Sequence, residues 1–214
     1  MKPGPDIIRR CSKCGDLIKE ETMESGNTFG ARIWTDGYMT APMMIQQPWY
    51  VCCPHCDQAV WLDEHEVVFK RHQYDLPIND EDDIFKRAWK PKPARDHQLR
   101  EYLNEGSSAR GKEVHARRTL WWSGNHVRRI STSDYPPLLK REIENLTAYL
   151  KFLDEENDNE RLQMAEIYRE MGEYSKAKKL LDKEFEGWNR ELAYFINWYN
   201  DQEFRAVREI KYKE

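Results

Sequence analysis

Short runs of hydrophobic residues dominate the first third of the chain and predict β-strands, because runs of this length bounded by turn residues are typical of small sheets. Asp36-Gly37 is a turn pair that tolerates positive φ, so it predicts a hairpin between two of these runs. The predicted strand segments are Ile7-Ile8, Leu17-Ile18, 29–34, 38–45, 49–52 and 59–62. Together they predict a small antiparallel sheet.

The second half of the chain has hydrophobic residues at spacings of three and four, which predict amphipathic helices. One such helix follows Ser131-Thr-Ser-Asp134, whose oxygens can cap it, and Pro136-Pro137 suits its first turn. The predicted helices cover 94–104, 111–129, 139–153, a pair within 161–181, and 187–211. A further short helix is predicted at 63–72, with acids in its first turn and bases in its last.

The stretch between these two regions is polar and broken by prolines. It contains the acidic run 79–83 and the sequence Lys90-Pro-Lys-Pro93, which cannot continue a helix. We therefore predict an α+β protein with three parts: a domain over residues 1–66, a linker with short helices over 67–108, and an all-helical domain over 109–214.

All five cysteines lie in the first region, as Cys11-Ser-Lys-Cys14-Gly and Cys52-Cys53-Pro-His-Cys56. A C-x-x-C turn places two sulfurs on one side of a metal ion, and a second turn completes a tetrahedral shell. The sequence therefore predicts a structural Zn²⁺ site and makes residues 1–66 a zinc-ribbon domain; iron held by the same sulfurs is the minor alternative. The predicted ligands are Cys11, Cys14, Cys53 and Cys56.

Several features of the two turns refine this prediction. Gly15 follows the first turn, where the backbone must bend, and Asp57 at the equivalent place can also reach the left-handed region. Whether Cys52 or His55 takes part in metal binding stays open. An odd cysteine count disfavours a disulfide framework. Cys53-Pro-His-Cys56 also allows a thiol–disulfide redox role, although a strand rather than a helix is predicted after it.

Residues 161–181 resemble one tetratricopeptide repeat, a helix-turn-helix unit. The positions that carry this resemblance are Ala165, Tyr168, Gly172, Tyr174, Ala177 and Leu181. With the two cysteine turns and Trp34-Thr-Asp-Gly37, the whole layout resembles uncharacterised bacterial proteins that pair a cysteine-rich ribbon with a tetratricopeptide-like helical tail. The resemblance implies a surface that binds protein partners.

Composition and charge bear on whether the protein binds nucleic acid or a membrane. The net charge is -4 and 34% of residues are charged, so the chain as a whole is not a basic nucleic-acid binder. The segment 110–129 is the exception, because its arginines and tryptophans could grip phosphates and stack on bases. No apolar run could span a bilayer and no signal segment opens the chain, so we expect a cytoplasmic protein with no membrane partner.

The sequence contains no catalytic signature, and its six histidines make no tight pair, which favours a protein that is not an enzyme. The function predicted first is an adaptor or regulatory module that binds a protein partner and contains a structural zinc ion. Nucleic-acid binding through the ribbon and segment 110–129 is the alternative, and the redox role of Cys53 and Cys56 is third.

Overall fold

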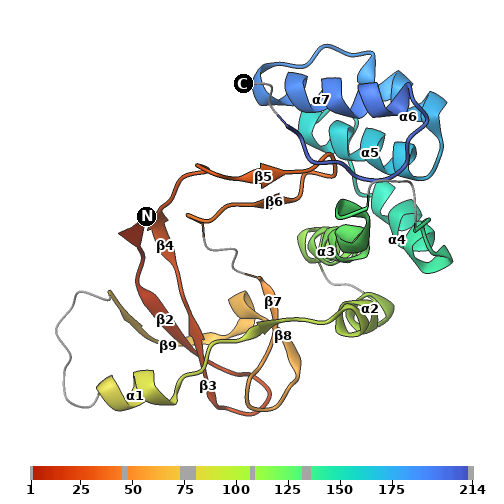
Figure 1. The fold of residues 1–214 in the computed structure, drawn as a ribbon. Coiled ribbons are helices and arrows are strands. Elements are labelled where there is room, and N and C mark those ends of the chain that lie inside the picture. Colours follow the sequence, from red (N-terminus) through yellow and green to blue (C-terminus); the bar gives the residue numbers. More distant parts are fainter. Residues whose placement is uncertain (1, 45–47, 73–80, 107–108, 132–135, 212–214) are drawn as a thin grey trace. The chain divides into compact units, whose positions relative to one another are not determined.

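A computed structural model describes residues 2–44, 48–72, 81–106, 109–131 and 136–211, and it confirms the α+β class. The chain folds into two compact units (Figure 1). The first comprises Met1–Ala31 with Ala41–Glu101, and the second comprises Arg32–Thr40 with Tyr102–Glu214. The three-part division at 66 and 108 stays a prediction.

The strands of the first unit form small antiparallel sheets rather than one continuous sheet. Their bounds are β1 (Lys2–Pro3), β2 (Asp6–Arg10), β3 (Leu17–Glu20), β4 (Met23–Ser25), β7 (Tyr50–Cys52), β8 (Ala59–Trp61), β9 (Glu66–Arg71) and β10 (Lys92–Pro93). The sheets have the strand orders β1-β4, β3-β2-β9 and β10-β7-β8. One cysteine turn joins β2 to β3 and the other joins β7 to β8, so the two turns belong to different sheets.

The helix predicted at 63–72 is wrong. A single 3-10 turn, Leu62–Glu64, is followed by β9, which pairs with β2. The acidic and basic ends of this segment suggested a helix, but Val67 and Val68 are β-branched and favour a strand. The open edge of β2 supplies the hydrogen-bonding partner that makes the strand stable.

The predicted linker contains ordered elements where it is described. These are nearly all of β9, then α1 (Glu81–Arg87), β10 and the whole of α2 (Asp96–Asn104). Lys92 and Pro93 pair with Cys52 and Val51, so this segment adds a third strand to the sheet of the second cysteine turn. Residues 79 and 80 of the acidic run lie outside the described residues.

The second unit holds the remaining helices, together with the hairpin of β5 (Arg32–Ile33) and β6 (Met39–Thr40). The helices are α3 (Arg110–Arg129), α4 (Lys140–Leu150), α5 (Asp158–Glu170), α6 (Tyr174–Leu181) and α7 (Gly187–Asn200). The predicted return strand ends at Thr40, short of residue 45, which lies outside the described residues. Gly172 adopts φ +80 just after α5, a left-handed conformation in which glycine commonly ends a helix.

Two helix ends differ from the prediction. Helix α4 begins at Lys140 rather than at the prolines, and the Glu142 carboxylate accepts from the Leu139 backbone N–H to cap it. The predicted capping residues 132–134 lie outside the described residues. Helix α7 ends at Asn200, and the chain beyond it turns back, so that Ile210 N–H donates to the carbonyl of Ile33.

The two halves of the second unit pack around separate apolar clusters. Helices α5, α6 and α7 surround Leu162, Ala165 and Ile196, which are at most 2% exposed. Helices α3, α4 and α5 meet at Trp121, Leu146 and Tyr149. Between these clusters lies the tip of the hairpin, where Thr35 and Asp36 are buried.

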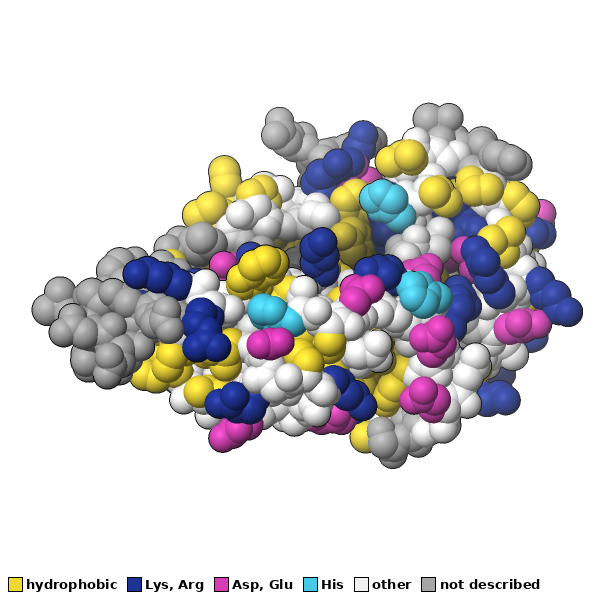
Figure 2. Space-filling view, turned by 90° about the horizontal axis from the view of Figure 1, so that it is seen from below, with side chains coloured by type: hydrophobic (Ala, Val, Ile, Leu, Met, Phe, Trp, Pro, Cys, Tyr) yellow, Lys and Arg dark blue, Asp and Glu magenta, His cyan; other side chains and the backbone are white. Residues whose placement is uncertain are grey.

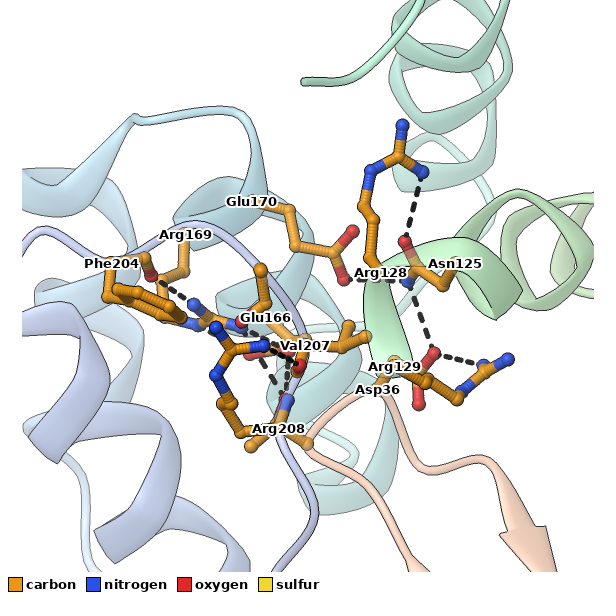
Figure 3. A network of polar contacts seen from close by, with 12 residues as sticks. Asp36, Asn125, Arg128, Arg129, Glu166, Arg169, Glu170, Phe204, Val207 and Arg208 are labelled. Atoms are coloured by element: carbon orange, nitrogen blue, oxygen red, sulfur yellow. Dashed lines mark hydrogen bonds and ion pairs between the residues drawn. The ribbon is translucent and has the colours of Figure 1, made fainter. Parts of the chain in front are cut away.

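Buried charges surround this hairpin tip (Figure 3). Asp36 pairs with Arg129 and accepts from the Asn125 amide at 3.1 Å. Glu166 pairs with Arg169 at 2.5 Å, and both side chains are completely buried. Arg169 also donates to the backbone carbonyls of Phe204 and Ala206, in the non-helical segment that follows α7.

Glu170 is a member of this network with one carboxylate oxygen that lacks a hydrogen-bond partner among the described residues. Its Oε1 accepts from Trp121 Nε1 at 3.0 Å and from Asn125 Nδ2 at 3.1 Å, while its buried Oε2 has no partner among the described residues. Burial raises the pKa of Glu170 well above its ordinary value, and the nearby carboxylates of Glu166 and Asp36 raise it further. Glu170 therefore favours its neutral, protonated form.

Replacing Glu170 with glutamine should stabilise the protein increasingly as the pH rises. The folded state keeps a proton on Glu170 at pH values where the unfolded chain has lost it, so the wild type loses stability as pH rises above about 4.3, by at most about 1.4 kcal/mol per pH unit. The glutamine amide oxygen would keep the two accepted hydrogen bonds, and the amide does not titrate.

Urea unfolding at pH 5, 6, 7 and 8 measures the effect, with Glu191→Gln at an exposed position of α7 as the matched control. A difference between E170Q and wild type that stays constant over this range would contradict a proton held on Glu170.

Candidate metal centre

The first cysteine turn follows β2 directly. Cys11 N–H donates to the carbonyl of Asp16 at 2.8 Å, and Gly15 N–H donates to the carbonyl of Cys11 at 2.9 Å. Gly15 has φ +81, a conformation that glycine adopts without a steric cost. These bonds fold the backbone tightly, so that Cys11 and Cys14 face the same side.

The second turn repeats this arrangement. Cys53 N–H donates to the carbonyl of Gln58 at 2.9 Å, and Asp57 N–H donates to the carbonyl of Cys53 at 3.0 Å. Asp57 has φ +56, so the predicted left-handed residue occurs at the same place in both turns. Two turns with the same backbone bonds therefore present their sulfurs in the same way.

The four sulfurs of Cys11, Cys14, Cys53 and Cys56 all lie within 4.8 Å of one another. Cys14 Sγ and Cys53 Sγ are 3.8 Å apart. A tetrahedron with zinc–sulfur bonds of about 2.3 Å has edges of roughly 3.8 Å, so this spacing suits a single ion. All five cysteines are described and all are free thiols, so none forms a disulfide.

The thiols affect one another's ionisation. Burial raises the pKa of Cys11, but the backbone N–H groups of Cys14 and Lys13 bind its sulfur and lower the pKa overall. Burial raises the pKa of Cys14 to about 12, and the neighbouring sulfurs add to the rise. Burial also raises the pKa of Cys53. Four thiolates this close need a cation, and a divalent metal ion supplies one.

Two residues that the sequence left open lie outside this group. Cys52 is buried and its Sγ donates to Gln98 Oε1 at 2.9 Å. His55 is exposed, and its Nε2 lies 3.2 Å from the carbonyl of Leu17. Neither side chain belongs to the group of four sulfurs.

Side chains from distant segments support the two turns, and sequence reasoning missed them. Gln98 on α2 donates to the carbonyl of Asp57 at 3.1 Å, and Arg95 binds the Asp57 carboxylate at 2.7 Å. Buried His65 accepts from the backbone N–H of Ser12 at 3.2 Å, inside the first turn. Only the fold brings these residues near the cysteines, so no motif marks them.

The basic segment predicted as a nucleic-acid surface is largely neutralised within the second unit. Trp121 is buried and Trp122 is half-buried, so these rings face inward as an amphipathic helix requires. Four of the arginines pair with carboxylates, in the pairs Arg110–Glu160, Arg117–Glu113, Arg128–Glu142 and Arg129–Asp36. On the face shown in Figure 2, basic and acidic side chains are interspersed.

The structure around Cys53 and Cys56 gives no support to the redox alternative. A reactive C-x-x-C thiol lies at the start of a helix, whose N-terminus lowers the thiol pKa. Here a turn and then β8 follow Cys56, and burial raises the pKa of Cys53.

Comparison with protein-family models, with curated proteins and with solved structures found no match to this chain. The resemblance to tetratricopeptide proteins is therefore without support beyond the chain's own residues, and the functional argument rests on geometry. Among the described residues, no helix is both long and apolar enough to cross a membrane.

Asp57→Gly should leave stability within about 1 kcal/mol of wild type, because glycine accepts the positive φ and the exposed Asp57–Arg95 pair contributes little. Asp57→Val should cost about 1–3 kcal/mol, because a β-branched residue is strained there. Thermal unfolding of the two variants measures the difference. Equal losses would show that the Asp57 carboxylate, and not its backbone conformation, supports the turn.

Proposed function

We propose that Cys11, Cys14, Cys53 and Cys56 hold one structural Zn²⁺ and that the protein acts as an interaction module. The observation that supports the metal site most directly is the approach of four sulfurs to within 4.8 Å of one another. Four thiolates fill a tetrahedral shell and leave no open position for a substrate, so the ion supports the fold rather than catalysis.

The sulfurs also contribute to the core of the first unit. Cys11 and Cys53 pack with Ile18, Val51 and Val60, all at most 4% exposed. A core this small gains much of its stability from a bound metal. The site forms only when the chain folds, so the free energy of metal binding adds to the free energy of folding.

The purified protein should contain about one zinc ion per chain by elemental analysis. Cys53→Ser should lose the metal and unfold the first unit. Cys52→Ser is the matched control, because it removes a neighbouring buried sulfur while its hydroxyl can still donate to Gln98; it should keep the metal and lose only about 1 kcal/mol.

A cobalt-substituted sample should show the absorption of a tetrahedral thiolate site in the wild type and C52S but not in C53S. Stoichiometric iron instead of zinc would support the rubredoxin-like alternative. Absence of any metal, or equal metal loss in C52S and C53S, would contradict the proposed ligand set.

The exposed aromatic face of α7 supports the interaction role. Tyr194 is 65% exposed and Trp198 is 49% exposed, and they lie one helical turn apart on the same face. Tyrosine and tryptophan are enriched at the centres of protein–protein interfaces. Four of the five α3 arginines pair with carboxylates, which weakens the support for a nucleic-acid partner.

Affinity capture from the native cell tests this role, with nuclease-treated and untreated samples compared. A protein partner should be captured in both samples, and the double substitution Tyr194→Ala/Trp198→Ala should reduce its recovery. Glu191→Gln on the same helix is the control. Capture that nuclease abolishes would favour the nucleic-acid alternative, and recovery unchanged in the double variant would remove α7 from the interface.

A further inference from the structure

One arginine of α3 differs from the others in its electrostatic surroundings. Its four fellow arginines each face a carboxylate, as described above. Arg118 makes no ion pair with any carboxylate in the described part of the chain, and its buried Nε has no hydrogen-bond partner there. The second unit therefore contains a half-buried guanidinium whose charge is not compensated locally.

Arg118 is nevertheless held in place. Its guanidinium carbon lies 5.0 Å from the centroid of the Trp122 ring, and the two residues are one turn apart on α3. Its charge acts on its neighbours: burial lowers the pKa of His115 to about 4, and the charge of Arg118 contributes to that shift. The buried Nε is shielded from water, so a ligand that accepts from it and supplies a counter-charge would be favourable.

Arg118 lines a pocket of about 260 Å³ within the second unit, which we call the Arg118 pocket. Two indole rings, Trp122 and Trp188, form part of its wall. Its other lining residues include three with side-chain amides, Asn159, Gln163 and Asn189. Small-molecule sites usually measure about 300–1,000 Å³, so this pocket suits a single side chain better than a whole cofactor.

Asp36 also lines the pocket but is already engaged. Its Oδ2 binds Arg129 and accepts from Asn125, and its Oδ1 accepts from the Tyr38 backbone N–H at 3.1 Å. Neither oxygen bonds to Arg118 in the structure. None of the described carboxylates bonds to Arg118, which leaves its guanidinium available to an anionic ligand.

We propose that the Arg118 pocket receives the carboxylate of an Asp or Glu side chain from a protein partner. This inference rests on the proposed interaction function and names the chemistry of the partner. One uncompensated guanidinium balances one carboxylate and can bind it through two parallel hydrogen bonds. A phosphate group carries nearly twice that charge, and Asp36 in the pocket wall disfavours the excess.

Titration with blocked amino acids tests whether the Arg118 pocket binds a carboxylate. NMR is suited to this test because it can measure weak binding. The probes are N-acetyl-glutamate N-methylamide, its glutamine counterpart and its phosphoserine counterpart, each added to the ¹⁵N-labelled full chain. The readouts are the indole N–H signals of Trp122 and Trp188 and the Nε–H signal of Arg118, assigned from R118Q.

The glutamate probe should cause saturable shifts and bind about tenfold more tightly than the glutamine probe. The glutamine probe has no negative charge, so it cannot form a charged hydrogen-bonded pair with Arg118. R118Q should abolish this preference. R110Q is the matched control: it removes the same charge from the same helix outside the pocket and should keep the preference.

Equal binding of the glutamate and glutamine probes, or a preference that survives in R118Q, would overturn the proposal. Tighter binding of the phosphoserine probe would replace carboxylate with phosphate as the ligand. Failure of this proposal can be distinguished from failure of the interaction function. If recovery of the captured partner depends on Tyr194 and Trp198 but not on Arg118, the interaction function stands and only the pocket proposal is rejected.

Discussion

The close approach of four sulfurs is the constraint on which the first unit depends. Cys11 and Cys53 are at once part of the apolar core and part of the sulfur group, so the core and the site cannot be separated. Each sheet of this unit has few and short strands, which bury little apolar area. The two turns belong to different sheets. Their sulfurs bring these sheets together, assisted by backbone bonds between β3 and Trp89 and by the contact of His55 with the Leu17 carbonyl. An ion bound there would join the sheets as well as fill the site.

In the second unit, buried charged side chains rather than sulfurs hold separate segments together. Arg169 and Glu166 are both fully buried, and Arg169 binds backbone carbonyls of the C-terminal segment, so one side chain fixes α5 against that segment. A buried ion pair of this kind adds little net stability, but removing one partner leaves a costly unpaired charge. Such a network therefore selects one arrangement of hairpin, helices and C-terminal segment over others. We regard this specificity, rather than stability, as its main effect.

The features that the sequence predicted are those with local causes. The two cysteine turns, the left-handed Gly15 and Asp57, the Asp36-Gly37 hairpin and the helical periodicity all depend on residues a few positions apart. The errors have distant causes. Segment 66–71 is a strand because β2 offers it an edge. The predicted helix 187–211 stops at Asn200, and Glu203 just beyond it has a φ of +53 while buried Arg169 binds carbonyls further along. Gln98 and His65 support the cysteine turns from other elements, which no spacing rule could indicate.

The hairpin belongs to the second unit, although the chain on either side of it belongs to the first. Residues Arg32–Thr40 leave the first unit, insert into the second and return, so the chain passes from one unit to the other at both ends of the hairpin. The hairpin supplies Asp36 to Arg129 and Asn125, and its backbone carbonyl accepts from Trp122 Nε1 at 3.0 Å. A helical unit without the hairpin would leave these groups buried and unpaired, which is unfavourable. The helices therefore need a segment that lies between the two cysteine turns in sequence, and that segment also forms one wall of the Arg118 pocket.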